Sequence, residues 1–311
     1  MVDTRLPQPN DSFRWVQVAS RPALVCRVLE PIARHLMTTR GWELGTGPTT
    51  DEERAWSEVA TALTVHVDRL VRVHQVHGAA ILIRRAGDGQ VATLPDADIV
   101  VSNDPAVGIA IQAADCVPIL IADRRTGAVA AAHAGWRGLA ADVPRVTVEA
   151  LAREFSSRPA DLVAAAGPSI GACCYEVGPE VRQRFEEGGW PESTMSGWFF
   201  TRPQPTMGNP SMAGARTEPR PGHWYFDSGR AACDQLESAG VPRDQIFVAK
   251  LCTASHPGAL CSYRRDGAGA GRLAGAIRAR GDGPSFNATV AFSEREVHDR
   301  QPRGRVKPCD R

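Results

Sequence analysis

His77, Cys116 and His133 have side chains that bind metal ions, and all three lie in the middle of the chain. A catalytic zinc ion takes three protein ligands from His, Cys and carboxylate side chains and leaves a fourth position for water or substrate. The three residues therefore predict one catalytic zinc site. Because they are far apart in the sequence, the alternative also stands that each histidine is an ordinary hydrogen-bonded structural residue.

Two charged residues beside this trio could take part in its chemistry. Arg137 shares a predicted loop with His133, and its guanidinium suits a bidentate contact to phosphate. Asp115 directly precedes Cys116 and could act as a general acid or base. The alternatives are a surface ion pair for Arg137 and, for Asp115, a turn-capping role or a hydrogen bond to a metal ligand.

Short apolar runs predict the strands that position these side chains. Residues 99–101, 107–111 and 117–122 are rich in Val and Ile and too short for helices, which favours buried strands. Cys116 and His133 fall where predicted strands begin or end. We therefore expect loops at strand ends to carry the reactive groups, while the sheet holds them rigid.

The flanking sequence predicts further strands and helices around this centre. Residues 13–28 contain two predicted strands, and a helix is expected after Asp51. Asp142 is predicted to cap a second helix, and a third is expected after Asp227. The last strand is predicted around residues 273–277.

We expect a single catalytic domain at residues 13–280, because no linker or internal repeat interrupts the pattern. The polar segments 1–12 and 281–311 are expected to be flexible extensions. Residues 196–223 are crowded with Pro, Gly, Met and Arg and lack a sustained period, which predicts a mobile insertion loop.

Composition gives no sign of a nucleic-acid or membrane partner. The formal net charge is only +1, and no apolar run reaches the ~20 residues that a membrane helix needs. The N-terminus lacks an apolar signal core, so the chain is expected to be cytoplasmic. Its eight cysteines show no compact framework, which favours reduced thiols or metal ligands over disulfides. Packing or surface roles rather than catalytic ones are expected for Cys173, Cys174, Cys233, Cys261 and Cys309.

Five motifs follow one another along the chain: HQVHG (74–78), DCVP (115–118), HAGWRG (133–138), GPSIGACCYEVG (167–178) and CTASHPGALCSYRRDGAGAGR (252–272). Together they resemble the family once called multicopper polyphenol oxidoreductase laccases, whose members are now regarded as purine nucleoside phosphorylases with adenosine deaminase activity. The resemblance implies that His77, Cys116 and His133 are the metal ligands. It also implies an α+β fold, a single domain with mixed β-sheets packed together and flanked by helices, as in an α/β/β/α sandwich.

The chain also departs from the family pattern at two places. His74 stands where relatives usually carry Lys, and residues 42–45 shorten a segment that usually contains Asn. A basic side chain at position 74 can still bind an anion or move a proton, although it is only partly charged near neutral pH. Arg264 lies in a matching loop, where it could bind substrate or pair with an acidic residue.

Three enzyme classes compete for this sequence. The leading one is a zinc-dependent purine nucleoside phosphorylase that converts adenosine, inosine or guanosine and phosphate to free base and ribose 1-phosphate, with adenosine deamination and methylthioadenosine phosphorolysis as further activities. Its expected catalytic residues are Asp115, Arg137 and His74, and its expected phosphate-binding residues are Arg40, Arg137 and Arg264. The sequence does not predict the preferred nucleoside or the oligomeric state.

The second class is a cysteine hydrolase or amidase that acts on cell-wall precursors, with Cys116 as nucleophile. A thiolate bound to a metal has its electron pair committed, so the metal content separates this class from the first. The third is a copper polyphenol oxidase, which needs several copper ions and many imidazoles. Eight histidines without a His-X-His pair favour zinc over copper.

Overall fold

Two six-stranded sheets pack face to face in the computed structural model, which describes residues 6–18, 20–45, 51–89 and 94–280. The first sheet has the order β1 (Phe13–Val18), β2 (Arg21–Cys26), β3 (Arg34–Thr38), β15 (Leu273–Arg278), β7 (Gly108–Ala113) and β4 (Leu70–Val71). The second has the order β14 (Ile246–Val248), β10 (Leu162–Ala166), β8 (Val117–Asp123), β9 (Val129–Ala134), β6 (Ile99–Ser102) and β5 (Ile81–Arg84). Both sheets contain parallel and antiparallel pairs.

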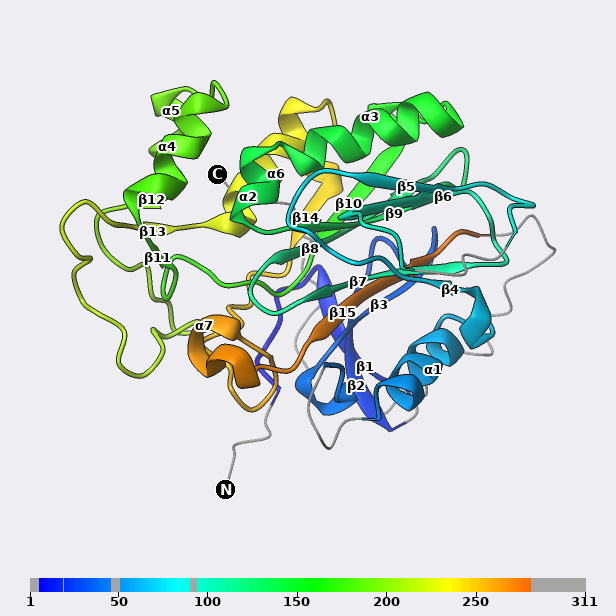
Figure 1. Cartoon of the computed structure of the whole chain (residues 1–311), viewed down its shortest axis with the longest axis horizontal. Coiled ribbons are helices and arrows are strands. Elements are labelled where there is room, and N and C mark those ends of the chain that lie inside the picture. Colours follow the sequence, from blue (N-terminus) through cyan, green and yellow to red (C-terminus); the bar gives the residue numbers. More distant parts are fainter. Residues whose placement is uncertain (1–5, 19, 46–50, 90–93, 281–311) are drawn as a thin grey trace.

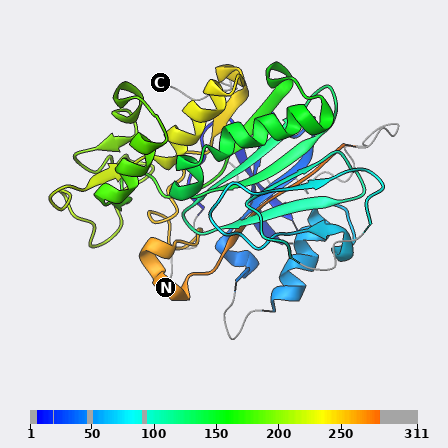
Figure 2. The ribbon, with the colours of Figure 1, turned by 45° about the horizontal axis from the view of Figure 1, so that its top comes forward.

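Helices cover the outer face of each sheet (Figures 1 and 2). Helix α1 (Glu52–Ala62) packs on the first sheet, and α2 (Trp136–Ala140), α3 (Val143–Phe155) and α6 (Ser228–Ser238) pack on the second. A small third sheet of β11 (Glu176–Val177), β13 (Trp224–Phe226) and β12 (Phe199–Phe200) extends from one end, together with α4 (Pro179–Glu187) and α5 (Glu192–Met195). A short helix, α7 (Tyr263–Asp266), lies beside this end. The expected α/β/β/α arrangement is confirmed.

Strand β8 shows why the central run is apolar at every position. Ile119 and Ile121 face the core under α3 and α6, whereas Leu120 and Ala122 face the core between the two sheets. Successive side chains of a strand point to opposite faces, so a strand that is covered on both faces must be apolar throughout. The strands expected at 99–101, 107–111 and 117–122 are confirmed as β6, β7 and β8.

Two of the three predicted helix caps are confirmed. The side chains of Asp51 and Asp227 accept hydrogen bonds from the backbone N–H groups of the first turns of α1 and α6. Asp142 precedes α3 as predicted but does not cap it. Its φ of 57° is left-handed, and its carboxylate accepts from Arg145 Nε at 2.7 Å instead of from a backbone N–H.

The second half of the expected extension at residues 1–12 contacts both large sheets. Asn10 Nδ2 donates to the Val248 carbonyl of β14 at 2.9 Å, and Trp15 Nε1 of β1 donates to the Pro7 carbonyl at 2.7 Å. This segment therefore lies against the edge strands β1 and β14. Residues 1–5 and the whole predicted extension 281–311 lie outside the described residues.

The predicted insertion loop 196–223 is a loop only in part. Trp198 and Phe199 are buried, and β12 pairs with β13. The aromatic side chains of this segment pack against Phe185 of α4, so apolar burial anchors its start. The sequence analysis predicts a loop throughout because the segment as a whole is rich in Pro and Gly.

The cysteines differ from the expectation of reduced thiols at one described position. Cys233 is disulfide-bonded, whereas Cys26, Cys116, Cys173, Cys174, Cys252 and Cys261 are free. Within the described ranges, none of the helices combines the length and the apolar character needed to cross a membrane.

The burial of His35 should make the stability of this fold depend on pH. His35 is fully buried on β3, where Nε2 accepts from Cys26 N–H at 2.8 Å and Nδ1 donates to the Ala33 carbonyl at 3.2 Å. Burial holds the pKa of His35 below its ordinary value, so the unfolded chain takes up this proton more readily than the folded one. Stability should therefore fall as pH drops below the unfolded value of ~6.5.

Urea unfolding at pH 7 and pH 5 measures this effect, which should reach up to about 2 kcal/mol for this one group. His35→Gln keeps a polar side chain that does not titrate, and its stability should depend less on pH. Equal pH dependence in the two proteins would contradict the assignment.

Candidate metal centre and active-site groove

The sheet brings together the three residues that the sequence singles out as metal ligands. Cys116 directly precedes β8, His133 lies near the end of β9, and His77 lies in the segment between β4 and β5. One nitrogen of each ring and the Cys116 sulfur all lie within 4.8 Å of one another. His133 is buried, Cys116 is half-buried and His77 is exposed, so the cluster opens toward solvent on one side.

A buried carboxylate, Asp98, orients this cluster. Asp98 Oδ1 accepts from His133 Nδ1 at 2.8 Å and from the His77 backbone N–H at 3.0 Å. Its second oxygen accepts from the Gly78 N–H at 2.6 Å. Because Nδ1 donates to Asp98, the His133 ring keeps Nε2 free as the donor atom toward Cys116.

The electrostatics of the cluster favour a charged sulfur. Burial alone would raise the pKa of Cys116, but hydrogen bonds from His133 and His77 lower it to about 6. Burial would lower the pKa of His133, but hydrogen bonds to Asp98 and Cys116 raise it to about 9. Burial would likewise raise the pKa of Asp98, but the hydrogen bonds from His133, Gly78 and His77 hold it below its ordinary value. The thiolate is the form of Cys that binds metals.

The backbone around the cluster leaves room for an ion. A Cβ at Gly135 would lie 2.8 Å from Cys116 Sγ and 3.3 Å from His77 Cδ2, so a larger residue would press on two donors. His77 and Asp115 have left-handed φ values of 60° and 91°, which cost non-glycine residues of order 1 kcal/mol or more. Two nitrogen donors, one sulfur donor and an open side are what a catalytic zinc ion requires.

A groove of about 580 Å³ lies in front of this open side. Its lining includes all three cluster residues, Asp115, the aromatic rings of Trp136, Tyr175 and Tyr263, and the basic side chains Arg72, His74, Arg137, Arg264 and Arg272. The volume is in the range of small-molecule sites. Its cationic and aromatic lining suits a ligand with an anionic group and a flat ring.

Two arginines expected to bind substrate point along aromatic walls of the groove. The Arg137 guanidinium lies over the Trp136 ring, with its Cζ 4.3 Å from the ring centroid. The Arg264 guanidinium lies over Tyr175 at 4.9 Å, and its Nη1 donates to the Glu176 carbonyl at 2.7 Å. Stacking fixes each guanidinium plane while its other N–H groups stay available to a ligand.

The remaining site residues predicted from the sequence, Asp115, His74 and Arg40, differ in how far they are buried and in whether they line the groove. Asp115 is buried at the back of the groove, accepts from Thr253 Oγ1 and from the Arg264 N–H, each at 2.6 Å, and has its pKa raised by burial. His74 is exposed at the rim, and its Nδ1 lies 2.7 Å from Asp96 Oδ1. Arg40 does not line the groove, since its Nη1 contacts the Pro257 carbonyl and the Asp266 carboxylate.

Sequence reasoning missed Asp98 and Tyr175. Asp98 stands alone at the start of an apolar strand, and a buried carboxylate needs donors, which could have marked it as a partner of a functional group. Tyr175 belongs to the quoted motif GPSIGACCYEVG, but no pattern in the sequence shows which side chains of this loop face the groove.

Comparison with known proteins gives one family. The family model described as multi-copper polyphenol oxidoreductase laccase matches residues 49–280. A purine nucleoside phosphorylase of Deinococcus radiodurans is 31% identical over 251 residues, which span 77% of this chain and 86% of that protein. The protein named SCO2081 of Streptomyces coelicolor, also a purine nucleoside phosphorylase, is 35% identical across 70% of this chain and 78% of its own length. A purine nucleoside phosphorylase of Bacteroides thetaiotaomicron is 34% identical, and this match spans only 60% of that protein's length.

Solved structures show the same fold. YlmD of Geobacillus stearothermophilus superposes with a TM-score of 0.66 at 29% identity, covering 86% of this chain and 99% of that one. The hypothetical protein YfiH of Bacillus licheniformis gives a TM-score of 0.72 at 24% identity, covering 85% and 99%.

Asp98→Asn tests the orienting role of the buried carboxylate. The amide can place its NH₂ group against His133 or the turn N–H groups, so the ligands lose their fixed orientation. We expect metal affinity to fall by about 10- to 100-fold, measured by competition with a chromogenic chelator. Asp123→Asn, a buried turn aspartate outside the groove, is the control and should bind metal like the unchanged protein. Equal affinity in Asp98→Asn would show that the carboxylate only packs.

Proposed function

Because the chain belongs to the multi-copper polyphenol oxidoreductase laccase family and its curated relatives are named purine nucleoside phosphorylases, we propose that it is a zinc-dependent purine nucleoside phosphorylase. It cleaves adenosine, inosine or guanosine with phosphate to give the free base and ribose 1-phosphate. Adenosine deamination and methylthioadenosine phosphorolysis are proposed as further activities. The observation that carries the proposal is an open His, Cys, His cluster that faces a groove lined by arginines and aromatic rings.

His77, Cys116 and His133 would hold the zinc ion. A zinc ion there supplies a Lewis acid that polarises oxygen and lowers the pKa of a bound water. Zinc fits better than a multicopper centre, which needs many imidazoles. Among the described residues only two histidines converge on one point, and the second convergent group has three sulfurs and no imidazole.

The chain's own side chains would bind and orient the substrates. Arg137 and Arg264 would neutralise phosphate, since both guanidinium groups line the groove and lie over aromatic rings. Tyr175 and Tyr263 offer ring faces for a purine. Binding both substrates in one groove would align the phosphate oxygen with the ribose carbon that it attacks.

Asp115 and His74 are proposed to handle protons. Burial favours the protonated form of Asp115, which could then share a proton with a leaving purine nitrogen. The contact of His74 with Asp96 orients its ring at the rim of the groove, where it would exchange protons with the substrate.

The cysteine hydrolase stays a second candidate, since one observation favours it. Asp98, His133 and Cys116 follow one another in the order of a carboxylate, base and nucleophile, as in a catalytic triad. Metal dependence separates the two readings. Full activity in metal-free protein that is blocked by thiol alkylation would favour the hydrolase.

Adenosine provides a test of the proposed reactions. With zinc and phosphate, the products should include adenine and ribose 1-phosphate, whereas turnover without phosphate should yield inosine alone, because deamination uses water. Chromatography of the products measures both. If zinc-loaded protein leaves adenosine, inosine and guanosine untouched, the nucleoside proposal is wrong.

Arg137→Ala should weaken phosphorolysis more than deamination, by up to ~3 kcal/mol in the apparent transition-state energy, because only phosphorolysis uses the anion. The kcat/KM for both reactions should be measured with the same preparation. Arg145→Ala removes an exposed arginine outside the groove and is the matched control. An equal loss of both reactions in Arg137→Ala would assign Arg137 a structural role.

A further inference from the structure

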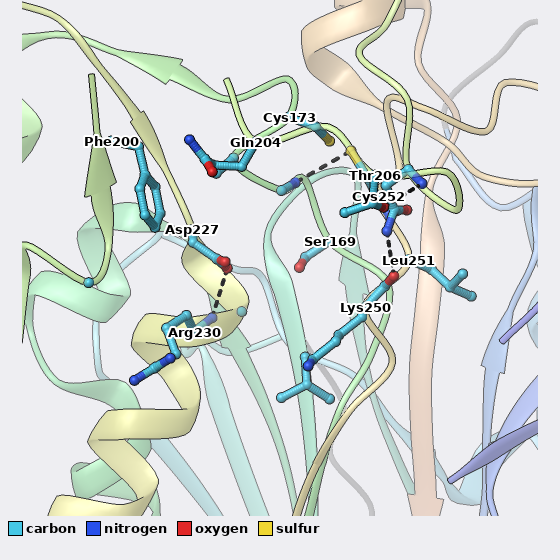
Figure 3. A pocket seen from close by; sticks show the side chains of 16 residues that line it. Ser169, Cys173, Phe200, Gln204, Thr206, Asp227, Arg230, Lys250, Leu251 and Cys252 are labelled. Carbon is cyan, nitrogen blue, oxygen red and sulfur yellow. Dashed lines mark hydrogen bonds between the residues drawn. The ribbon is translucent and has the colours of Figure 1, made fainter. Parts of the chain in front are cut away.

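A second group of three cysteines converges away from the active-site groove. The sulfurs of Cys173, Cys174 and Cys252 lie within 4.8 Å of one another, and all three side chains are buried. Figure 3 shows Cys173 and Cys252 pointing toward each other at the wall of a pocket of about 330 Å³. Cys173 and Cys252 line this pocket, whereas Cys174 lies behind them.

Two loops at the ends of neighbouring strands bring the sulfurs together. Strands β10 and β14 run parallel, and the segments after them stay paired, with Ser169 opposite Cys252. The Ser169 N–H donates to the Leu251 carbonyl at 3.2 Å, and the Thr253 N–H donates to the Ser169 carbonyl at 3.1 Å. The backbone therefore fixes where Cys252 lies relative to the other two cysteines.

Hydrogen-bond donors point at the sulfurs. The Gly171 N–H donates to Cys252 Sγ at 3.4 Å, a bond that Figure 3 marks with a dashed line to Cys252, and the Met212 N–H donates to Cys174 Sγ at 3.2 Å. The Ser255 Oγ lies 3.5 Å from Cys173 Sγ and 3.6 Å from Cys174 Sγ, and its hydroxyl donates to the Pro210 carbonyl at 2.6 Å. The two backbone N–H donors stabilise thiolates, the form that binds metal.

We propose that Cys173, Cys174 and Cys252 form a second metal site, which binds a thiophilic closed-shell cation, Zn²⁺ or Cu⁺, through three thiolates. Each thiol releases its proton to solvent when the metal binds. With zinc–sulfur bonds of about 2.3 Å, tetrahedral ligation places sulfurs about 3.8 Å apart, so the cluster needs only a small contraction. Zn²⁺ would take Ser255 or water as a fourth ligand, whereas Cu⁺ is satisfied by three sulfurs.

A cation bound to Cys173, Cys174 and Cys252 would stabilise one wall of the active-site groove. Thr253, next to Cys252, donates to Asp115, and Tyr175, next to Cys174, lines the groove. The Ile170 N–H also donates to the Asp115 carbonyl at 2.9 Å. One ion would therefore tie together the two loops that position Asp115 and Tyr175.

The competing explanation is that the thiols only fill space. Together with Ile170 and Ala254 they form a small apolar cluster, and a thiol packs well among apolar groups. Packing alone predicts no metal, so metal stoichiometry decides between the two explanations.

The test counts metal ions per chain in reduced protein that is loaded with Zn²⁺ and then dialysed. The unchanged protein should hold two zinc ions, Cys116→Ala one, Cys252→Ser one, and the double variant none. Cys261→Ser removes a buried cysteine outside both clusters and should keep two. Since Cys116→Ala removes only the first site, failure of one site is distinguishable from failure of the other. Equal zinc in the unchanged protein and Cys252→Ser would overturn the proposal.

A second arm identifies the ligands and the preferred ion. Co²⁺ bound to Cys116→Ala should show intense sulfur-to-metal charge-transfer absorption, which Cys173→Ser should lose in the same background. If Cys252→Ser does not fold, as judged by circular dichroism, this pair of proteins decides the question. Absence of the absorption at saturating Co²⁺ would overturn the site. Competition between Zn²⁺ and Cu⁺ under reducing conditions then identifies the preferred ion.

Discussion

The candidate active site depends on the burial of one charge, the carboxylate of Asp98. A buried carboxylate is costly unless donors surround it, and here His133 and the N–H groups of residues 77 and 78 supply them. The His133 N–H also donates to the Asp98 carbonyl at 2.8 Å, so the pairing of β6 with β9 sets this geometry. The neighbouring pairing of β8 with β9 places Cys116 beside Gly135. The register of strands β6, β8 and β9 therefore fixes how the predicted metal ligands lie relative to one another.

The three residues predicted to be metal ligands converge in the structure, and the central strands are confirmed, because both predictions follow from local chemistry. His, Cys and His are rare metal-binding types, and the run 117–122 is apolar on both faces of its strand. The partner of Asp98 could not be identified in this way, since His133 lies far along the chain and their contact depends on strand order. The charge of Arg40 predicts a contact with substrate, whereas in the structure Arg40 forms an ion pair with Asp266.

The groove shows how the fold gathers positive charge in one place, although the whole chain has a formal net charge of only +1. Arg137 and Arg264 come from α2 and α7, which lie far apart in sequence, and each stacks on an aromatic ring that also lines the groove. A lysine could not reproduce this arrangement, because an ammonium has no plane to stack or to present in bidentate form. The positive field is therefore local and directional.

Asp115 connects the two cysteine-containing clusters through short contacts. It is bonded covalently to Cys116 on one side, and on the other its carboxylate accepts from Thr253, the neighbour of Cys252. Its left-handed φ of 91° is a strained state that persists only where the surroundings hold it. The loops around residues 170 and 253 supply that support, since both bond to Asp115. Any group that fixes these loops therefore also fixes the backbone that presents Cys116 to the groove.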